Sequence, residues 1–310
     1  MRILVLGAAA GGGFPQWNCN CDVCALARSE PERARPRTQS SLAISADGKR
    51  WFLLNASPDL RQQIMDNSPL WPDPARKRGS GIAGTILTNG DVDHVCGLVN
   101  LRESQKLNLY ATDRILSALG GNSVFDVLNP DFVSRHTLAL GEEFEPVDPE
   151  NGPSGLRVEP FAVPGKVALY LENAEAGDNF GSQPEDTIGL KISVPSTGKV
   201  FYYVPGCATV SPDLADRIRG AQLVMFDGTL WRDQEMIEAG VGIKTGQRMG
   251  HMSMSGADGS IAAFRSLDVA RKVYVHINNT NPVLVEDSAE RREAESAGWE
   301  IAWDGMEISL

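Results

Sequence analysis

Short apolar runs of strand length recur along the chain, and most of them end in glycine or in a cluster of polar residues. Apolar runs of about four to eight residues bounded by turn residues are typical of buried strands. The pattern predicts strands at 3–7, 40–46, 50–57, 85–89, 108–112, 156–165, 199–207, 221–231 and 271–282. Asp47-Gly48 between the second and third of these predicts a hairpin turn.

Helical segments separate several of these strands. Residues 57–67 begin with Ser57 as a cap and Pro58 in the first helical position, which is typical of a helix N-terminus. Residues 167–194 are predicted to contain two apolar strands, one at each end, with a polar lobe between them. Further helices are predicted at 113–119 and 259–267, and residues 290–310 predict a helix and a closing strand. Alternating strands and helices indicate a layered α/β fold, and we expect one domain over 1–310.

Composition and charge narrow the classes of partner. The 310 residues are 42% hydrophobic, enough for a substantial core, and carry a formal net charge of −11. Binding to nucleic acid requires clustered Lys and Arg, whereas the basic runs at 28–37 and 76–78 are short and contain no interleaved aromatics. The N-terminus lacks a secretory layout, and no run approaches the ~20 apolar residues of a membrane span. We therefore expect a cytoplasmic protein with no nucleic-acid partner and no membrane span.

Residues 88–98, TNGDVDHVCGL, join a predicted strand to a predicted helix and crowd four polar side chains into six positions. Carboxylate oxygens and an imidazole nitrogen together form a ligand set for a divalent metal. The alternative, an Asx turn with a helix N-cap, accounts for one or two of these residues but not for the histidine before an apolar helix. We interpret Asp91, Asp93 and His94 as metal ligands, with Asn89 as a further candidate.

A second group of candidates stands at the ends of other predicted strands. His276 follows an apolar strand and opens the polar loop INNTNP, where α/β folds commonly bind ligands, so we expect it to bind the metal. Asp227 also ends an apolar strand, where a charge is costly unless it is paired. Its alternative role is a cap on the Gly228 turn. We expect Asp227 to orient His251 and the two to act as catalytic acid/base residues, although His251 could equally bind metal.

Three cysteines form the spacing C-x-C-x-x-C at Cys19, Cys21 and Cys24. Thiolates favour zinc over the hard cations, so this spacing predicts a structural zinc. A redox thiol cluster or three unrelated cysteines are the alternatives. The fourth zinc ligand is not visible in the sequence, and His276 or a neighbour on its loop is the candidate.

The strings that carry these residues resemble one family along essentially the whole chain: FPQWNCNCDVC, RTQSS, LLNASPDLRQQ, TNGDVDH, FDGTLW, MGHMS and HINNTNP. They are similar to the coenzyme PQQ biosynthesis protein B family of the metallo-β-lactamase superfamily. The resemblance implies a four-layer αβ/βα sandwich with two central mixed sheets and the metal at their rim. It also implies a structural zinc at the cysteine motif and a homodimer.

The metal box departs from the superfamily pattern HxHxDH, because Asn89 and Asp91 stand where the two leading histidines belong. Hydrolytic members also carry a metal-bridging Asp where this chain has Gly206, and a histidine where it has Pro164-Gly165. A two-zinc cluster cannot be assembled from these positions, so a two-metal phosphodiesterase or β-lactamase is not expected.

Asp93, His94 and His276 remain, and two imidazoles with one carboxylate are the ligand set of non-haem Fe(II) oxygenases. The resemblance implies iron- and O₂-dependent hydroxylation of the tyrosine ring of a cross-linked Glu–Tyr precursor in PQQ biosynthesis. Its partners would be that small-molecule PQQ precursor and, as candidates, other PQQ-biosynthesis proteins. Two alternatives stay open: a carrier that moves PQQ or its precursor towards the periplasm, and a metal-dependent hydrolase on the same scaffold.

Overall fold

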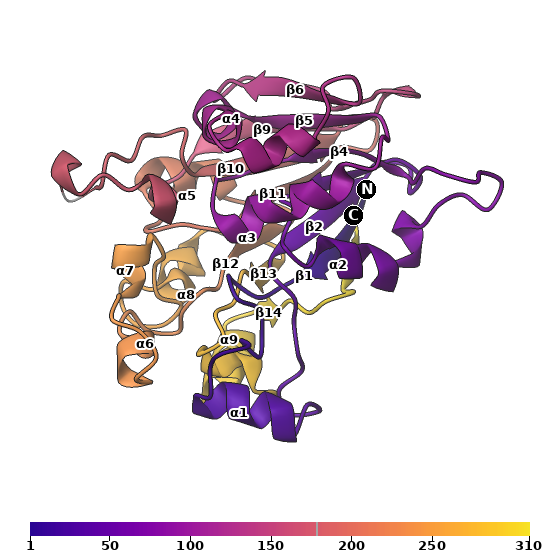
Figure 1. The fold of residues 1–310 in the computed structure, drawn as a ribbon. Coiled ribbons are helices and arrows are strands. Elements are labelled where there is room, and N and C mark those ends of the chain that lie inside the picture. The colour runs from indigo at the N-terminus through magenta and orange to yellow at the C-terminus, as the bar shows by residue number, and fades with distance from the viewer. Residues whose placement is uncertain (178) are drawn as a thin grey trace.

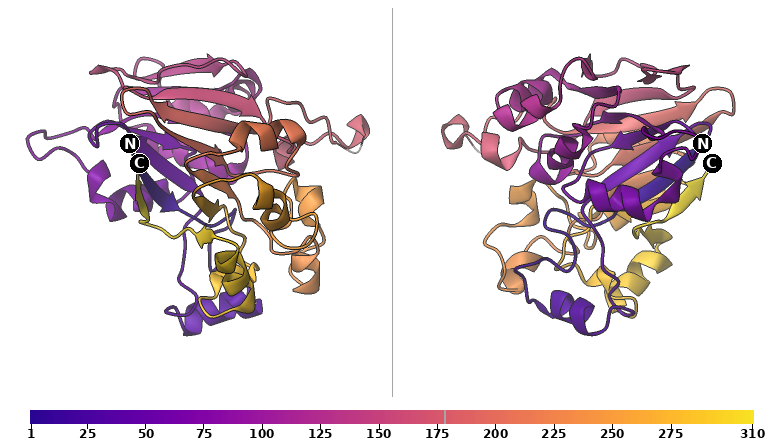
Figure 2. Two further views of the ribbon diagram at one scale, coloured as in Figure 1. Left: turned by 180° about the vertical axis from the view of Figure 1, so that it is seen from behind. Right: turned by 45° about the vertical axis from the view of Figure 1, so that its right-hand side comes forward.

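Two β-sheets lie face to face, and helices cover the outer face of each (Figures 1 and 2). The computed structural model describes residues 1–177 and 179–310. The first sheet has the order β15 (Glu307–Ser309), β1 (Arg2–Gly7), β2 (Ser41–Ser45), β3 (Trp51–Leu54), β4 (Ile82–Ile86), β5 (Leu107–Thr112), β6 (Val133–Leu138). The second has the order β14 (Trp299–Ile301), β13 (Lys272–Val275), β12 (Val224–Asp227), β11 (Lys199–Val204), β10 (Ile188–Val194), β9 (Arg157–Ala162). A small hairpin pairs β7 (Val147–Asp148) with β8 (Gly152–Pro153).

The helices are short. The α-helices are α1 (Asp22–Ser29), α2 (Leu60–Asp66), α3 (Val92–Val95), α4 (Asp113–Gly120), α5 (Pro212–Ile218), α6 (Glu235–Glu238), α7 (Gly246–Met249), α8 (Ser260–Ala263) and α9 (Ala289–Ser296). The 3₁₀ turns are η1 (Ser68–Leu70), η2 (Cys96–Leu101), η3 (Ser123–Val127), η4 (Leu169–Leu171), η5 (Ala174–Ala176), η6 (Phe264–Ser266) and η7 (Pro282–Leu284).

Side chains alternate across each sheet and divide the core into three layers. In β1, Ile3 and Val5 point into the core between the sheets, while Leu4 and Leu6 pack with α2, η2 and α4 on the outer face. In β12, Met225 belongs to the central core, and its neighbours pack outward against α1, α5 and α9. Full burial of one such side chain stabilises the fold by about 1.5–3 kcal/mol. The resulting helix–sheet–sheet–helix order confirms the predicted four-layer α/β sandwich.

Both sheets are mixed, and the arrangement of their parallel strands locates the functional site. Strands β3 to β6 run parallel in one sheet, and β11 to β14 run parallel in the other. The carboxyl ends of parallel strands meet at one edge of a sheet, where α/β folds bind ligands. The segment 88–94 follows β4, Asp227 ends β12, and His276 follows β13 directly. The polar residues predicted from the sequence therefore gather at one edge of the sandwich.

Three local predictions were wrong. The helix predicted over 57–67 begins at Leu60 instead, because Ser57 forms a turn and its hydroxyl bonds to Gln63 at 3.1 Å, leaving Asp59 as the N-cap. The apolar run at 167–171 does not form a strand: Val167 and Ala168 are buried, but residues 169–171 form η4, whose two leucines are 56% and 41% exposed. The closing strand predicted in 290–310 is two strands, β14 and β15, which belong to different sheets.

Among the residues that the structure describes, no helix combines the length and the apolar character that a bilayer span requires.

Candidate metal centre at the edge of the sheets

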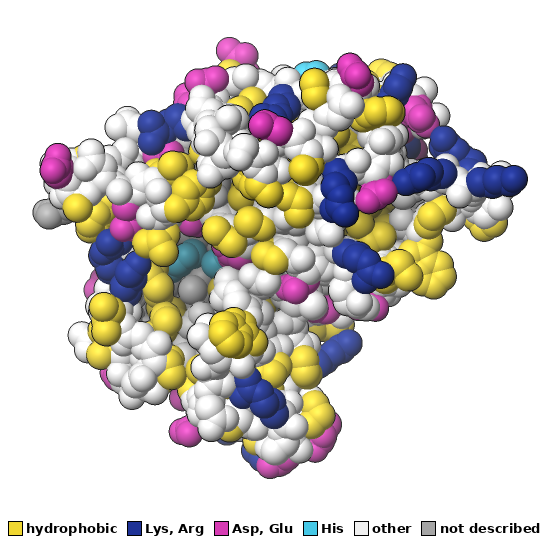
Figure 3. All heavy atoms as spheres, in the orientation of Figure 1, with side chains coloured by type: hydrophobic (Ala, Val, Ile, Leu, Met, Phe, Trp, Pro, Cys, Tyr) yellow, Lys and Arg dark blue, Asp and Glu magenta, His cyan; other side chains and the backbone are white. Residues whose placement is uncertain are grey.

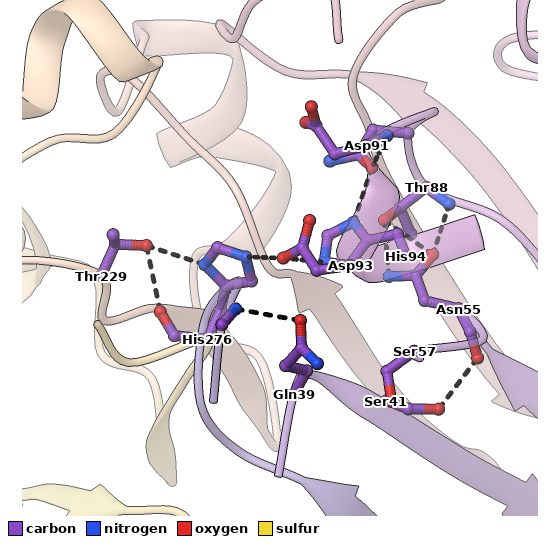
Figure 4. A network of polar contacts seen from close by, with 12 residues as sticks. Gln39, Ser41, Asn55, Ser57, Thr88, Asp91, Asp93, His94, Thr229 and His276 are labelled. Atoms are coloured by element: carbon purple, nitrogen blue, oxygen red, sulfur yellow. Dashed lines mark hydrogen bonds and ion pairs between the residues drawn. The ribbon is translucent and has the colours of Figure 1, made fainter. Parts of the chain in front are cut away.

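Asp93, His94 and His276 converge, although they come from opposite sheets. Their ligand atoms all lie within 4.8 Å of one another. His276 Nε2 lies 3.1 Å from Asp93 Oδ2, and His94 Nε2 lies 3.9 Å from the same oxygen. Figure 4 shows the Asp93 carboxylate between the two imidazole rings, whose centroids are 5.2 Å apart. One carboxylate and two imidazole nitrogens thus face a common point.

Close backbone approach and one unusual backbone conformation position these side chains. Gly97 follows the short helix α3, and a Cβ at that position would overlap the carbonyl oxygen of Ser57. Only glycine lets η2 and α3 lie this close to the segment after β3. His276 itself has a φ of 55°, in the left-handed region that non-glycine residues rarely adopt. Such conformations cluster at functional sites, and here the turn carries the ring out of β13 towards Asp93.

Asn89 contacts the centre through His94. Its Oδ1 accepts a hydrogen bond from the backbone N–H of Asp91 at 3.0 Å and lies 2.6 Å from His94 Nδ1. The other ring nitrogen of His94, Nε2, is buried and has no hydrogen-bond partner among the described residues. Buried polar atoms are normally satisfied, so an unpaired nitrogen that faces a carboxylate and a second imidazole is an exception that calls for an explanation.

Asp91 is not part of this convergent group. Its Oδ1 accepts a hydrogen bond from the backbone of Leu169 at 3.4 Å, and its carboxylate does not meet the ligand atoms of Asp93, His94 and His276 within 4.8 Å. Burial, together with the negative charge of Asp93, raises the pKa of Asp91. A metal role for Asp91 therefore stays a prediction.

The electrostatics of the convergent group favour a charged carboxylate among buried imidazoles. Burial would raise the pKa of Asp93, but the nearby His94 and the hydrogen bond with His276 outweigh it and hold that pKa well below its ordinary value. Burial lowers the pKa of His94 to about 4, so this imidazole is neutral near pH 7. Burial also acts to lower the pKa of His276, but the bond with Asp93 outweighs it and the pKa is raised.

Asp227 and His251 form a hydrogen-bonded pair beside the first group. His251 Nδ1 lies 2.7 Å from Asp227 Oδ2, and the Asp227 carboxylate is fully buried. The backbone N–H of Cys207 also donates to this carboxylate at 2.8 Å, and the backbone N–H of Thr229 does so at 2.9 Å. Burial would raise the pKa of Asp227, but the contact with His251 outweighs it and the pKa is lowered. Asp227 thus holds His251, in the arrangement expected from the sequence.

Asp227, His251 and His276 also form a second group whose ligand atoms lie within 4.8 Å. The rings of His251 and His276 stack with centroids 5.1 Å apart. Asp227 already accepts four hydrogen bonds through its two oxygens, which is the usual complement of a buried carboxylate. The second group therefore has no free acceptor site on its carboxylate, whereas the first group retains an imidazole nitrogen without a hydrogen-bond partner among the described residues.

The two superfamily ligand positions that glycine occupies here lie beside this pair. A Cβ added at Gly206 would come within 3.5 Å of His251 Cε1, so the ring of His251 packs against the place where a bridging Asp would project. A Cβ at Gly165 would lie 2.7 Å from Thr187, too close for a side chain of any size. An added side chain would collide only at Gly165, whereas at Gly206 the 3.5 Å separation from His251 is ordinary van der Waals contact.

The three predicted zinc ligands also converge, at α1. The sulfurs of Cys19, Cys21 and Cys24 lie within 4.8 Å of one another. Asn279 faces all three: its Nδ2 lies 3.2 Å from Cys19 Sγ, 3.3 Å from Cys24 Sγ and 3.9 Å from Cys21 Sγ. His276 is wrong as a fourth ligand, because its ring nitrogens face Asp93 and Thr229. The candidate neighbour on the same loop is Asn279, whose amide oxygen and nitrogen exchange places on rotation.

The convergent group lies beneath a hollow in the surface. Figure 3 shows histidine side chains at the floor of a hollow bordered by hydrophobic and by Lys and Arg side chains. Exposed apolar residues near this mouth include Leu169, Tyr170 and Leu171 of η4, and the Tyr170 hydroxyl donates to the carbonyl of Gly90 at 2.9 Å. The bordering segment is therefore bonded directly to the metal box.

Two polar residues of the site were missed in the sequence. Thr229 bonds to Asp227, His251 and His276 at once, and Asn279 closes the cysteine group. Thr229 follows Asp227 by two positions, which is the spacing of a side-chain-to-backbone turn and a signal that could have been read. Asn279 carried no such signal, since its neighbours in INNT are equally polar.

The chain is similar to known proteins along its whole length. The family model described as a beta-lactamase superfamily domain matches residues 50–277. Coenzyme PQQ synthesis protein B of Rhodopseudomonas palustris (strain TIE-1) is 53% identical over 312 residues, covering 100% of both chains. The protein of the same name from Methylorubrum extorquens (strain PA1) is 53% identical over 310 residues, again with 100% of both covered.

Solved structures show the same relationship. The structure of Zn²⁺-bound PqqB from Methylobacterium extorquens superposes with a TM-score of 0.94 at 53% identity, covering 100% of both chains. A diphosphatase of the PhnP family superposes with a TM-score of 0.66 at 19% identity over 99% of this chain and 97% of that one, which shows a shared fold alone. The chain therefore belongs to the coenzyme PQQ synthesis protein B family of the beta-lactamase superfamily.

Proposed function

We propose that this chain is an Fe(II)- and O₂-dependent hydroxylase that acts on the tyrosine ring of a cross-linked Glu–Tyr precursor in PQQ biosynthesis. Membership of the coenzyme PQQ synthesis protein B family supports the pathway. The donor set supports the chemistry, because two imidazoles and one carboxylate with open positions are the ligands of non-haem iron oxygenases. The beta-lactamase superfamily domain supports a metal-dependent enzyme.

One observation carries the proposal: the buried Nε2 of His94 has no hydrogen-bond partner among the described residues and faces Asp93 and His276. A buried nitrogen without a partner costs free energy, and a metal ion bound there would use its lone pair. The residues present thus fit one divalent ion held by Asp93, His94 and His276. Bound iron would supply the activation of O₂, and the side chains around it handle the substrate and its protons.

Asp227 and His251 supply the acid/base function. The Asp227 carboxylate accepts His251 Nδ1 at 2.7 Å, which fixes the ring and leaves Nε2 as the exchanging nitrogen. His251 retains 17% exposure of its side chain, whereas Asp227 retains none, so only the imidazole can meet a substrate. We assign to His251 the removal of the phenolic proton and to Asp227 the orientation of His251.

We further propose that the cysteine group holds a structural zinc. Three thiolates within 4.8 Å satisfy three of the four positions of a tetrahedral site, and the Asn279 amide faces the remaining side. The zinc would join α1 to the loop that carries His276, because Asn279 and His276 share that loop.

The decisive experiment is O₂ consumption by anaerobically purified protein loaded with Fe(II) and supplied with a cross-linked Glu–Tyr compound and a two-electron reductant, which is needed to reduce to water the oxygen atom that does not enter the ring. Asp93→Ala and His94→Ala should abolish uptake. The matched control is His136→Gln, since His136 belongs to neither metal group and its Nε2 bonds to Asn108 at 2.9 Å in β6. Turnover without metal would refute the hydroxylase, and zinc-dependent hydrolysis of a phosphodiester panel without O₂ uptake would replace it with a hydrolase.

A further inference from the structure

We propose that Asn89 and Thr229 are positioning residues that fix the tautomers of the two metal-facing histidines. Each accepts a hydrogen bond from Nδ1 of its histidine, Asn89 from His94 and Thr229 from His276. The hydrogen then stays on Nδ1, and the lone pair on Nε2 of each ring is directed towards the proposed metal ion. The inference rests on the proposed metal centre, because it takes both histidines as ligands. It assigns Asn89, which stands at a superfamily ligand position, a role that requires no contact with the metal.

The argument for Asn89 starts from a donor whose identity is certain. The backbone N–H of Asp91 can only donate, so the Asn89 atom that receives it at 3.0 Å is the amide oxygen. The same oxygen lies 2.6 Å from His94 Nδ1. An amide oxygen carries no hydrogen, so this short contact is a hydrogen bond only when Nδ1 is the donor. A neutral imidazole with its hydrogen on Nδ1 has its lone pair on Nε2, the buried atom that lacks a partner.

The Thr229 hydroxyl has a single hydrogen to donate. Two oxygens lie within hydrogen-bond distance of it: Asp227 Oδ1 at 2.6 Å and the carbonyl oxygen of His276 at 3.0 Å. The buried carboxylate is the stronger acceptor, because bonds to ionised groups are shorter and stronger. His276 Nδ1, at 2.8 Å, can then meet the hydroxyl only as a donor. The Nε2 of His276 is left to face Asp93 at 3.1 Å.

The two acceptors belong to opposite sheets but act in the same way. Asn89 follows β4 in the first sheet and Thr229 follows β12 in the second. Acceptors behind a metal-bound histidine set its tautomer and ring orientation, and their loss typically lowers metal affinity by about 10–100-fold. Replacement of a ligand histidine by Asn89 therefore converts one metal-binding position into one that orients a remaining ligand.

Tautomers can be read directly by NMR. The chain contains only four histidines, so ¹⁵N-histidine labelling gives four imidazole patterns that single-residue variants can assign. Long-range ¹H–¹⁵N correlations distinguish a hydrogen on Nδ1 from one on Nε2. In the zinc-loaded protein, which is diamagnetic, we expect Nδ1–H at both His94 and His276. If His94 lacks a hydrogen on Nδ1, the inference for Asn89 is refuted, and if His276 lacks one, the inference for Thr229 is refuted. Neither conclusion depends on the metal affinity of the variants.

Metal affinity supplies the second readout. Co²⁺ bound at the cysteine group gives sulfur-to-metal charge-transfer absorption, whereas Co²⁺ bound by Asp93, His94 and His276 gives only weak visible bands, so the two sites are titrated separately. Asn89→Leu and Thr229→Val remove the acceptors with little change in volume. They should weaken Co²⁺ binding at the histidine site by about 10–100-fold and leave the thiolate bands unchanged.

Conservative variants separate positioning from simple loss of structure. Asn89→Asp and Thr229→Ser keep an acceptor oxygen and should retain wild-type Co²⁺ affinity and the Nδ1–H pattern. Wild-type affinity in both Asn89→Leu and Thr229→Val would refute the inference while leaving the metal centre intact. Absence of the histidine-site bands in the wild-type protein would refute the metal centre, and the NMR pattern of His94 in the metal-free protein at pH 8 would still test its Nδ1–H tautomer, because its Nε2 has no partner among the described residues.

Discussion

Glu235→Gln should stabilise the protein at alkaline pH and leave it unchanged in acid. Glu235 lies in α6 with only 6% of its surface exposed. Its Oε1 accepts the Thr280 hydroxyl at 2.6 Å, and its Oε2 accepts the backbone N–H of Trp231 at 2.7 Å. Burial raises the pKa of Glu235 from 4.5 to about 7, because these neutral donors and the charge of Arg232 compensate only part of the desolvation.

The size and the sign of the effect follow from that difference. The folded protein retains the proton up to about pH 7, whereas the unfolded chain loses it near 4.5. The stability associated with the proton is therefore complete below pH 4.5 and is lost as the pH rises through 7. At about 1.4 kcal/mol per pH unit, the loss amounts to about 3 kcal/mol. Glutamine stays neutral at every pH and accepts or donates at the same two partners, so Glu235→Gln avoids this loss.

Urea unfolding at pH 5 and pH 8.5, followed by tryptophan fluorescence, measures the effect. Glu235→Gln should exceed wild type by about 3 kcal/mol at pH 8.5 and match it closely at pH 5. The control is Glu238→Gln in the same helix, because Glu238 is 50% exposed and pairs with Arg232 at the surface. Parallel pH profiles for wild type and Glu235→Gln would refute the argument that an uncompensated buried carboxylate lies at this position.

Three further outcomes test other parts of the structure. Gly97→Ala should destabilise the protein by about 2 kcal/mol or more in chemical unfolding, because the added Cβ meets the Ser57 carbonyl. The control Gly120→Ala has open space around the added Cβ and should be neutral, and equal effects of the two substitutions would contradict the close approach of η2 to Ser57. Cys24→Ser should lower the zinc content, measured by elemental analysis, by one equivalent. It should also lower the free energy of unfolding, measured by thermal unfolding, by about 3 kcal/mol. An unchanged zinc content would contradict the cysteine site. His251→Gln should lower the hydroxylation rate by about 10²–10⁴-fold without reducing iron content, and loss of the iron would instead make His251 a ligand.

The layered fold could be predicted because it follows from local patterns. The runs 3–6 and 223–226 are apolar at every position, as expected for strands covered on both faces, and they form most of β1 and β12. The failures occurred where tertiary context overrides a local pattern. The run 167–171 is as apolar as a strand, yet only Val167 and Ala168 are buried, and the side chains of residues 169–171 are exposed beside the site.

The composition of the site was predictable, but its connections were not. Asp93, His94 and His276 could be named because costly residue types stand at strand ends. From the sequence, Thr229 could be expected only to join the turn after Asp227, and Asn279 carried no signal, because the long-range contacts of a hydroxyl or an amide at a turn are set by the packing around it. Thr229 reaches His276 across 47 positions, and Asn279 reaches Cys24 across 255. Hydrogen bonds over such separations depend on how the sheets pack.

The distribution of ligands over both sheets implies that metal binding and folding are linked. Asp93 and His94 follow β4 of the first sheet, and His276 follows β13 of the second, so the three atoms meet only when the sheets pack. In the metal-free protein that packing buries one carboxylate and two imidazoles, and it leaves His94 Nε2 without a partner among the described residues. A bound ion stabilises the folded state by RT ln(1 + [metal]/Kd), because the unfolded chain offers no assembled site. In the proposed centre that stabilisation comes from the ion held by Asp93, His94 and His276, and the residues that orient these side chains contribute to it through the metal affinity.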